Sequence, residues 1–170
     1  MTNYTEKNSV INIDINEENV YADYGFDGKL LVEETLVDKM EFLASSRPIK
    51  EKVTFCFRRK YNIAIDEPQF VEAYKNTMNN YVKAKQHEIS RCLWTGIIML
   101  FVSLILIFIE NFWLINLGAI VGEISNIASW VFAWAAIEVL TIQLIQLVID
   151  KRKVQRLRDA KITFEEDLTE

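Results

Sequence analysis

The sequence predicts an α+β membrane protein, in which a transmembrane hairpin of two helices is inserted in a small cytosolic α+β domain. The first observation behind this prediction is the distribution of charge. Of the 170 residues 25% are charged, yet residues 92–149 carry only Glu110, Glu123 and Glu138. The second is the pattern on either side, where alternating and amphipathic segments indicate strands and helices. Such segregation is typical of a membrane sector joined to a water-soluble sector.

Residues 1–28 form an acidic N-terminal arm with a candidate strand. The acidic side chains of this arm outnumber its only base, Lys7, and a solvated arm is expected. Within it, the segment VINIDI alternates, so that Ile11, Ile13 and Ile15 share one face. This pattern fits a half-buried strand.

Residues 29–91 are predicted to make up most of the cytosolic α+β domain. A helix is expected before Pro48, with an apolar face formed by Val32, Leu36, Met40 and Leu43. The segment KVTFCFRR then alternates, and its β-branched and aromatic residues favour a strand. A second helix begins near Asp66, and its apolar stripe consists of Val71, Tyr74, Met78, Val82 and Ile89.

Two membrane spans are predicted within the hairpin 92–149, at about 92–110 and 124–147. The uncharged stretch 92–109 follows the second helix without a break, so one long helix is expected to enter the bilayer. At about 1.5 Å per residue, it approaches the roughly 30 Å of hydrocarbon. The stretch 110–123 is apolar but short, and we interpret it as an interfacial or re-entrant turn.

Basic residues predict the orientation of the hairpin. They lie just before the first span and just after the second, whereas the connecting loop has no Lys or Arg. Both termini are therefore expected in the cytosol. The residues expected to fix this topology and to contact anionic lipid headgroups are Arg91, Lys151, Arg152, Lys153, Arg156 and Arg158.

The basic C-terminal segment 150–170 predicts a helical extension followed by a short strand. The segment KITF resembles KVTF, and Ile162 and Phe164 alternate with polar residues. Our hypothesis is that KITF and VINIDI join KVTFCF in a small sheet that the helix at 29–45 covers.

This order of elements, with the Trp-rich segment SWVFAWAAIEV before a basic run and a short strand, resembles a family of small two-pass bacterial membrane proteins. The resemblance covers residues 30–165 and is one of layout. It implies a location in the bacterial inner membrane and carries no activity, since none is known for that family.

Signatures of enzymes and cofactors are sparse. His87 is the only histidine, and no glycine-rich phosphate loop is visible. Cys56 and Cys92 have no metal-ligand spacing, so free thiols are expected. The net charge of −5 argues against binding to nucleic acid. We therefore expect no catalytic, cofactor-binding or metal-binding residues, and no nucleic-acid partner.

Glu138 is the most unusual residue of the second span. Trp130, Trp134 and Glu138 are spaced by four residues, and Thr141 continues their helical face. Glu138 lies about 18 Å along the helix from Asp150, which would be near mid-bilayer if Asp150 marks the boundary. Three readings stay open: a protonated hydrogen-bond donor that fixes packing or assembly, an acid near the headgroups of a shorter span, or part of an ion path formed by several copies.

The function expected from these features is that of a membrane-anchored scaffold or sensor module that self-associates and acts by interaction. Its expected partners are the lipid bilayer, further copies of the chain and a cytosolic protein. The alternative is an oligomeric channel-like or membrane-perturbing effector built around Glu138.

Overall fold

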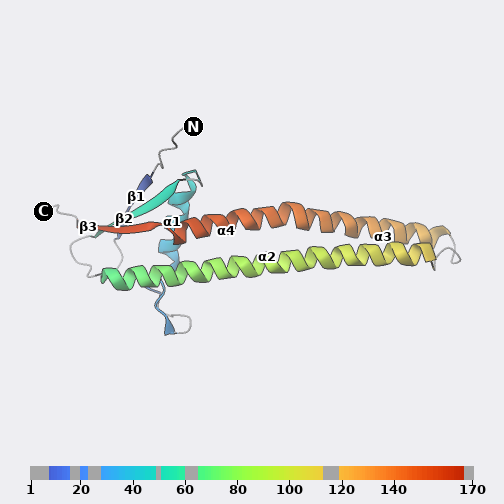
Figure 1. Cartoon of the computed structure of the whole chain (residues 1–170), viewed down its shortest axis with the longest axis horizontal. Coiled ribbons are helices and arrows are strands. Elements are labelled where there is room, and N and C mark those ends of the chain that lie inside the picture. The colour runs from blue at the N-terminus through green and yellow to red at the C-terminus, as the bar shows by residue number, and fades with distance from the viewer. Residues whose placement is uncertain are drawn as a thin grey trace, which may run out of the picture. The chain divides into compact units, whose positions relative to one another are not determined.

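The computed structural model describes residues 8–15, 20–22, 28–48, 51–59, 65–112 and 119–166. Its elements, shown in Figure 1, are the strands β1 (Asn8–Ile15), β2 (Lys52–Arg59) and β3 (Lys161–Glu166), the helices α1 (Glu34–Ser45), α2 (Glu67–Phe112), α3 (Ala119–Glu138) and α4 (Leu144–Arg158), and a π-helical turn at Val139–Gln143. The chain is mostly helical, with one small parallel sheet.

Two compact units divide the chain. The sheet unit comprises Met1–Lys83 and Arg152–Glu170, and the hairpin unit comprises Ala84–Lys151. The sequence placed these boundaries after residues 91 and 149. Most of the predicted acidic arm lies outside the described residues.

The sheet has the strand order β1-β2-β3, and both pairs of neighbours are parallel. The predicted joining of VINIDI and KITF to KVTFCF is therefore confirmed. The register aligns Ile11, Phe55 and Ile162 in one row across the sheet, and Ile13, Phe57 and Phe164 in the next. Because parallel neighbours need a crossover connection, α1 lies between β1 and β2, and the whole helical hairpin lies between β2 and β3.

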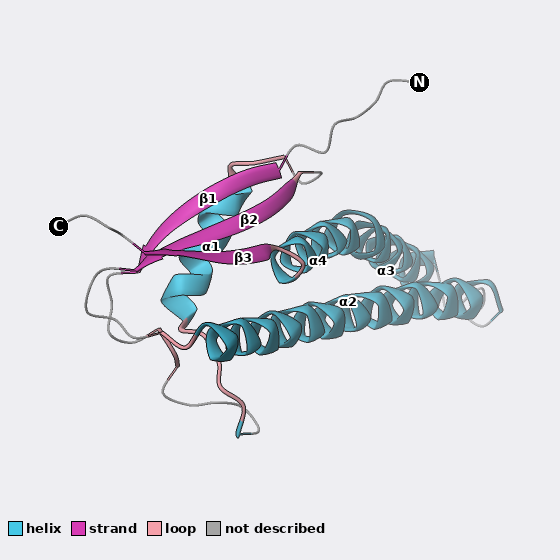
Figure 2. Ribbon diagram, turned by 60° about the vertical axis from the view of Figure 1, so that its left-hand side comes forward, coloured by secondary structure: helices cyan, strands magenta, loops and turns pink. Residues whose placement is uncertain are grey.

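The core of the sheet unit forms where α1, the start of α2 and the end of α4 meet one face of the sheet. Figure 2 shows α1 across this face. From α1 come Val37, Met40 and Ala44, all buried. The buried Tyr74 hydroxyl of α2 donates a hydrogen bond of 2.6 Å to the carbonyl of Leu157. Burial raises the pKa of the Tyr74 phenol, which keeps it protonated as this donor.

The predicted helix at 29–45 is shorter than expected, and its apolar face is different. It begins at Glu34, and Val32 instead forms a β-bridge with Tyr21 and donates its N–H to Thr77 Oγ1 at 2.9 Å. Leu36 and Leu43 are only partly buried. The spacing misled because Val32 is buried in the same core as α1, although it precedes the helix.

The expected continuous helix is confirmed, since α2 runs unbroken for 46 residues. The predicted turn at 110–123 is partly helical, because α2 continues to Phe112 and α3 begins at Ala119. Residues 113–118 of that turn lie outside the described residues.

Candidate functional site: the outer face of the hairpin

Small and polar residues form the inner seam between α2 and α3. The Ser103 hydroxyl donates a hydrogen bond of 2.9 Å to the Ser129 carbonyl, and both residues are buried. Gly96 is also buried, and a Cβ added there would lie 2.6 Å from Cγ of Leu140. The absence of a side chain at Gly96 thus leaves the space that the Leu140 side chain fills.

Replacing Gly96 with leucine is therefore expected to weaken the hairpin. Overpacking of a tight contact costs about 1–3 kcal/mol. The free energy of hairpin unfolding, measured by tryptophan fluorescence during titration with a denaturing detergent, should fall by that amount. Gly122→Leu is the matched control, because nothing lies within 4 Å of a Cβ at Gly122. Equal losses in both variants would contradict the tight contact between Gly96 and the Leu140 side chain.

Contacts across the seam determine which residues of α2 lie level with Glu138. Ser103 contacts Ser129, and Cys92 Sγ lies 3.6 Å from the Val139 carbonyl oxygen, so the helices run antiparallel. Glu138 therefore lies level with the first turn of the uncharged stretch 92–109. At the other end, Glu110 and Asn126 line one small cavity. Measured against α2, Glu138 lies near the edge of the apolar segment and not at its middle.

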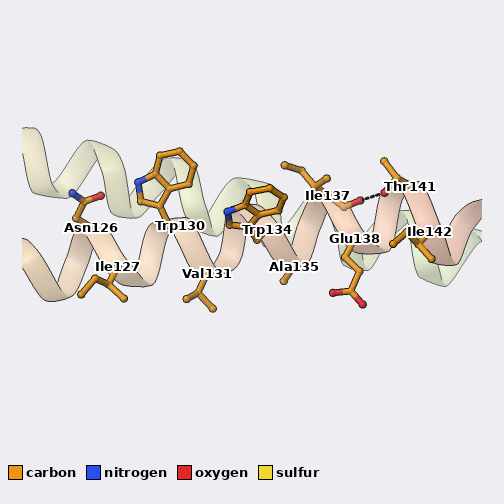
Figure 3. Close-up of a pocket in the computed structure, with 10 residues that line it drawn as sticks. All are labelled: Asn126, Ile127, Trp130, Val131, Trp134, Ala135, Ile137, Glu138, Thr141 and Ile142. Atoms are coloured by element: carbon orange, nitrogen blue, oxygen red, sulfur yellow. Dashed lines mark hydrogen bonds between the residues drawn. The ribbon is translucent and has the colours of Figure 1, made fainter.

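A groove of about 800 Å³ follows the outer face of α3, turned away from the seam. All of its lining residues belong to 126–142, and Figure 3 shows them. The indole rings of Trp130 and Trp134 are 62% and 64% exposed and form one wall. The Glu138 carboxylate lies along the opposite wall, on the side of Val131.

The four residues predicted to share a face, Trp130, Trp134, Glu138 and Thr141, all line this groove. They do not form one row. Each step of four residues advances about 40° beyond a full turn, so Glu138 lies about 80° around the helix from Trp130. The structure thus places an acceptor on one wall and two N–H donors on the other.

The π-helical turn begins directly after Glu138, and no pattern in the sequence predicted it. Such a turn disturbs the ladder of backbone hydrogen bonds. Side chains bond to two carbonyls here: the Thr141 hydroxyl donates to the Ile137 carbonyl at 2.6 Å, and the Cys92 thiol donates to the Val139 carbonyl. π-Helical turns are frequent at functional sites, so the segment beside Glu138 is a candidate functional position.

The basic residues predicted to contact lipid headgroups have unlike surroundings. Arg91 and Arg152 are exposed, and Lys153 is half-buried. Lys151 Nζ donates to Gln86 Oε1 at 3.1 Å. Arg158 pairs with Asp159 at 2.9 Å, and this carboxylate raises the pKa of the guanidinium. They therefore do not form a single exposed surface.

Arg156 differs most from the prediction, because it points into the sheet unit. Its Nε donates to the Glu51 carbonyl at 2.9 Å and its Nη1 to the Arg47 carbonyl at 3.3 Å. Burial lowers the pKa of this guanidinium. The side chain ties the end of α4 to the connection between α1 and β2.

No group of three or more His, Cys, Asp or Glu side chains that could hold a metal ion occurs in the described ranges. Cys56 is buried and Cys92 is half-buried, and neither forms a disulfide. Burial raises the pKa of the Cys56 thiol, which disfavours its reactive thiolate. His87 is an exposed residue of α2.

Two helices of the described chain are long and apolar enough to cross a membrane, Glu67–Phe112 and Ile120–Arg158. In the most apolar 18-residue window of each, only 11% of the residues are buried. No protein-family model, curated protein or solved structure matches this chain.

Proposed function

We propose that this protein is a two-pass membrane protein that self-associates through the groove on α3 and acts as a membrane-anchored interaction or sensor module. The observation that carries the proposal is the exposure of apolar side chains along both long helices. Helix α2 alone carries seven large apolar side chains that are at least half exposed: Trp94, Ile98, Phe101, Leu104, Ile105, Phe108 and Phe112.

Water is a poor solvent for such a surface. Soluble monomers rarely expose contiguous apolar patches larger than a few hundred Å². The core helix of a soluble protein is also apolar, but it is mostly buried. In the most apolar 18-residue window of each long helix here, only 11% of the residues are buried. A bilayer is the environment that would cover both outer faces.

The proposed location is the bacterial inner membrane, with both termini in the cytosol. The supporting pattern is the one described above: no Lys or Arg occurs between Arg91 and Lys151. The sheet unit, which contains both chain ends, would then face the cytosol, where a protein partner could reach it.

Self-association is supported by the chemistry of the groove. Indole N–H groups are donors only and a carboxylate is an acceptor, and the two kinds of group lie on opposite walls. In two copies related by a twofold axis, the indole donors of each copy would face the Glu138 carboxylate of the other. The same contact would thus occur twice, as in an isologous interface.

The first span offers Glu138 little within its own chain. The Thr95 hydroxyl donates to the Arg91 carbonyl at 2.9 Å, and the Ser103 hydroxyl donates to the Ser129 carbonyl at 2.9 Å. Near the edge of the apolar segment a carboxylate costs less than at the bilayer centre, so it can remain charged there. Indole N–H groups of a second copy would then be suitable hydrogen-bond donors for it.

Cysteine cross-linking of the full-length protein in neutral lipid vesicles tests this interface. Val131, on the groove wall, is 61% exposed, and Ile105 on α2 is 50% exposed. Val131→Cys is expected to form a covalent dimer with a short bifunctional thiol reagent, whereas Ile105→Cys and the unsubstituted protein are not. Equal yields at both positions would indicate random collision, and no dimer at Val131 would indicate a monomer. Either result would overturn self-association through the groove.

The alternative function, an oligomeric channel-like effector, is favoured by one observation, the π-helical turn beside Glu138. Glu138→Gln separates the two functions, because glutamine keeps hydrogen-bonding capacity but cannot carry a proton. If the protein is an interaction module, proteoliposomes with the unsubstituted protein should pass no more protons than protein-free liposomes do. Cross-linking through Val131→Cys should also persist when Glu138→Gln is added. Proton flux through the unsubstituted protein that falls with Glu138→Gln would establish the channel instead.

A further inference from the structure

A polar cavity of about 370 Å³ lies between α2 and α3, near the end of the hairpin where α2 stops and α3 starts. Its lining includes Ser103, Glu110 and Asn111 of α2 and Asn126, Ser129 and Trp130 of α3. We propose that this cavity binds a primary ammonium group. The proposal goes beyond the proposed function and does not depend on self-association through the groove on α3.

Spacing along each helix directs these side chains to one cavity. Ser103 and Glu110 are about two turns of α2 apart, so they lie on the same face of that helix. Asn126 and Trp130 are about one turn apart, and Figure 3 shows them on the same side of α3. The closed end is formed by Ser103 and Ser129, which are 3% and 1% exposed. Glu110 is half-buried and Asn126 is exposed, so a ligand would enter beside Asn126.

The polar atoms of the cavity are mainly hydrogen-bond acceptors. The hydroxyl hydrogens of Ser103 and Ser129 are already used, since these groups donate to the carbonyls of Ser129 at 2.9 Å and Asn126 at 2.7 Å. Asn111 Nδ2 donates to a backbone carbonyl of α2 at 2.9 Å, which leaves its Oδ1 as an acceptor. The Glu110 carboxylate adds two acceptor oxygens. A primary ammonium suits such a lining, because it has three N–H donors and no acceptor.

The hairpin supplies no nearby cation for the Glu110 carboxylate. Glu110 is the only ionisable residue among the described residues that line the cavity. No Lys or Arg occurs between Arg91 and Lys151, and Arg91 lies about 28 Å from Glu110 along α2. No hydrogen bond or ion pair in the described part of the chain involves this carboxylate. One carboxylate balances one positive charge, which suits a monovalent ammonium.

Trp130 and the volume of the cavity favour an ammonium on a short chain. An indole ring attracts a cation that lies within about 6 Å of its centroid, and Trp130 lines the cavity. The volume corresponds to the share of about twelve water molecules in the liquid. It is at the low end of the range for ligand sites, about 300–1,000 Å³. An aminoethyl group would therefore fit, with its nitrogen beside Glu110.

The ammonium could belong to a soluble amine or to the headgroup of phosphatidylethanolamine, and calorimetry distinguishes the two sources. The full-length protein in phosphatidylcholine nanodiscs is titrated with ethanolamine and, separately, with choline at constant pH and ionic strength. Ethanolamine is expected to bind and choline is not, because the choline ammonium has no N–H to donate. The ethanolamine titration is then repeated in nanodiscs that contain phosphatidylethanolamine. Equal affinity in both nanodiscs identifies a soluble amine, whereas weaker binding beside phosphatidylethanolamine identifies a headgroup that competes for the cavity.

Substitutions on both walls test the cavity itself. Glu110→Gln is expected to weaken ethanolamine binding about tenfold, as the loss of a charged hydrogen bond implies. Glu123→Gln is the matched control, because it removes one negative charge from the same hairpin at an exposed position outside the cavity. Asn126→Asp adds a carboxylate to the opposite wall and is expected to tighten binding, a result that a damaged fold could not produce.

Thermal unfolding of each variant verifies that it is folded. Four results would overturn the proposal: no ethanolamine binding in phosphatidylcholine nanodiscs, equal binding of choline, equal weakening by Glu110→Gln and Glu123→Gln, or no tightening by Asn126→Asp. Each of these is measured without cross-linking, so failure of the ammonium site is distinct from failure of self-association at Val131.

Discussion

The substitution Phe57→Ala is expected to unfold most of the sheet unit while leaving the hairpin helices in place. Phe57 lies on the central strand and is completely buried. Its ring centroid is 5.0 Å from that of Phe70 and 5.7 Å from that of Phe164, so one ring joins α2 to β2 and β3. Truncation of a buried phenylalanine costs about 3–5 kcal/mol, a large share of the about 5–15 kcal/mol of a typical domain.

Hydrogen–deuterium exchange of β2 would measure this loss in the sheet unit. Tryptophan fluorescence would monitor the hairpin separately, because all four tryptophans lie between residues 94 and 134. Phe42→Ala is the control, since the Phe42 ring is 76% exposed and its removal should change stability by no more than about 0.5 kcal/mol. Similar exchange in the two variants would contradict the core described for this unit.

Deletion of residues 160–170 is expected to destabilise the sheet unit to a similar extent. The deletion removes β3, including Phe164, whose ring packs against Phe57 and Phe70. The two remaining strands lose the third strand and the packing of its ring, so protease cleavage within β1 and β2 should become faster. A deletion restricted to 167–170, beyond the end of β3, serves as the control. Unchanged protease resistance after the longer deletion would show that β3 contributes little.

The strands could be predicted from the sequence because their pattern is local. In each of the three, apolar residues alternate with polar ones, and the side chains of Ile13, Phe55 and Phe57 are buried as the alternation requires. Their parallel register could not be predicted. It depends on contacts between segments that are far apart in the chain, such as Phe57 with Phe164, and no local pattern encodes those.

The candidate site was predicted in composition but not in geometry. Spacing by four residues placed Trp130, Trp134 and Glu138 together, and they do line one groove. Because four residues exceed one helical turn, the two indole rings and the Glu138 carboxylate lie on different walls of the groove. The position of Glu138 relative to α2 follows from contacts between the helices, such as that of Cys92 with Val139. Counting residues from Asp150 along a single helix does not include such contacts, so the sequence alone could not predict this position.

The contacts of Arg156 could not be predicted from its charge. Its position in a basic run after a predicted span indicated contact with lipid headgroups, as for its neighbours. The structure directs its guanidinium to the backbone carbonyls of Arg47 and Glu51, more than 100 residues away in sequence. Nothing in the sequence marks those carbonyls as acceptors, because every residue has one.

The insertion of the hairpin between β2 and β3 has a consequence for biosynthesis. About 100 residues separate the end of β2 from the start of β3, and ribosomes add about 5–20 residues per second. One edge of β2 therefore lacks its partner for about 5–20 s while the helices are made. With the topology proposed above, the sheet would close only when the polypeptide returns to the compartment that holds its first half. Completion of the domain would then depend on a correctly turned hairpin, because β3 can reach β2 only after the chain has returned.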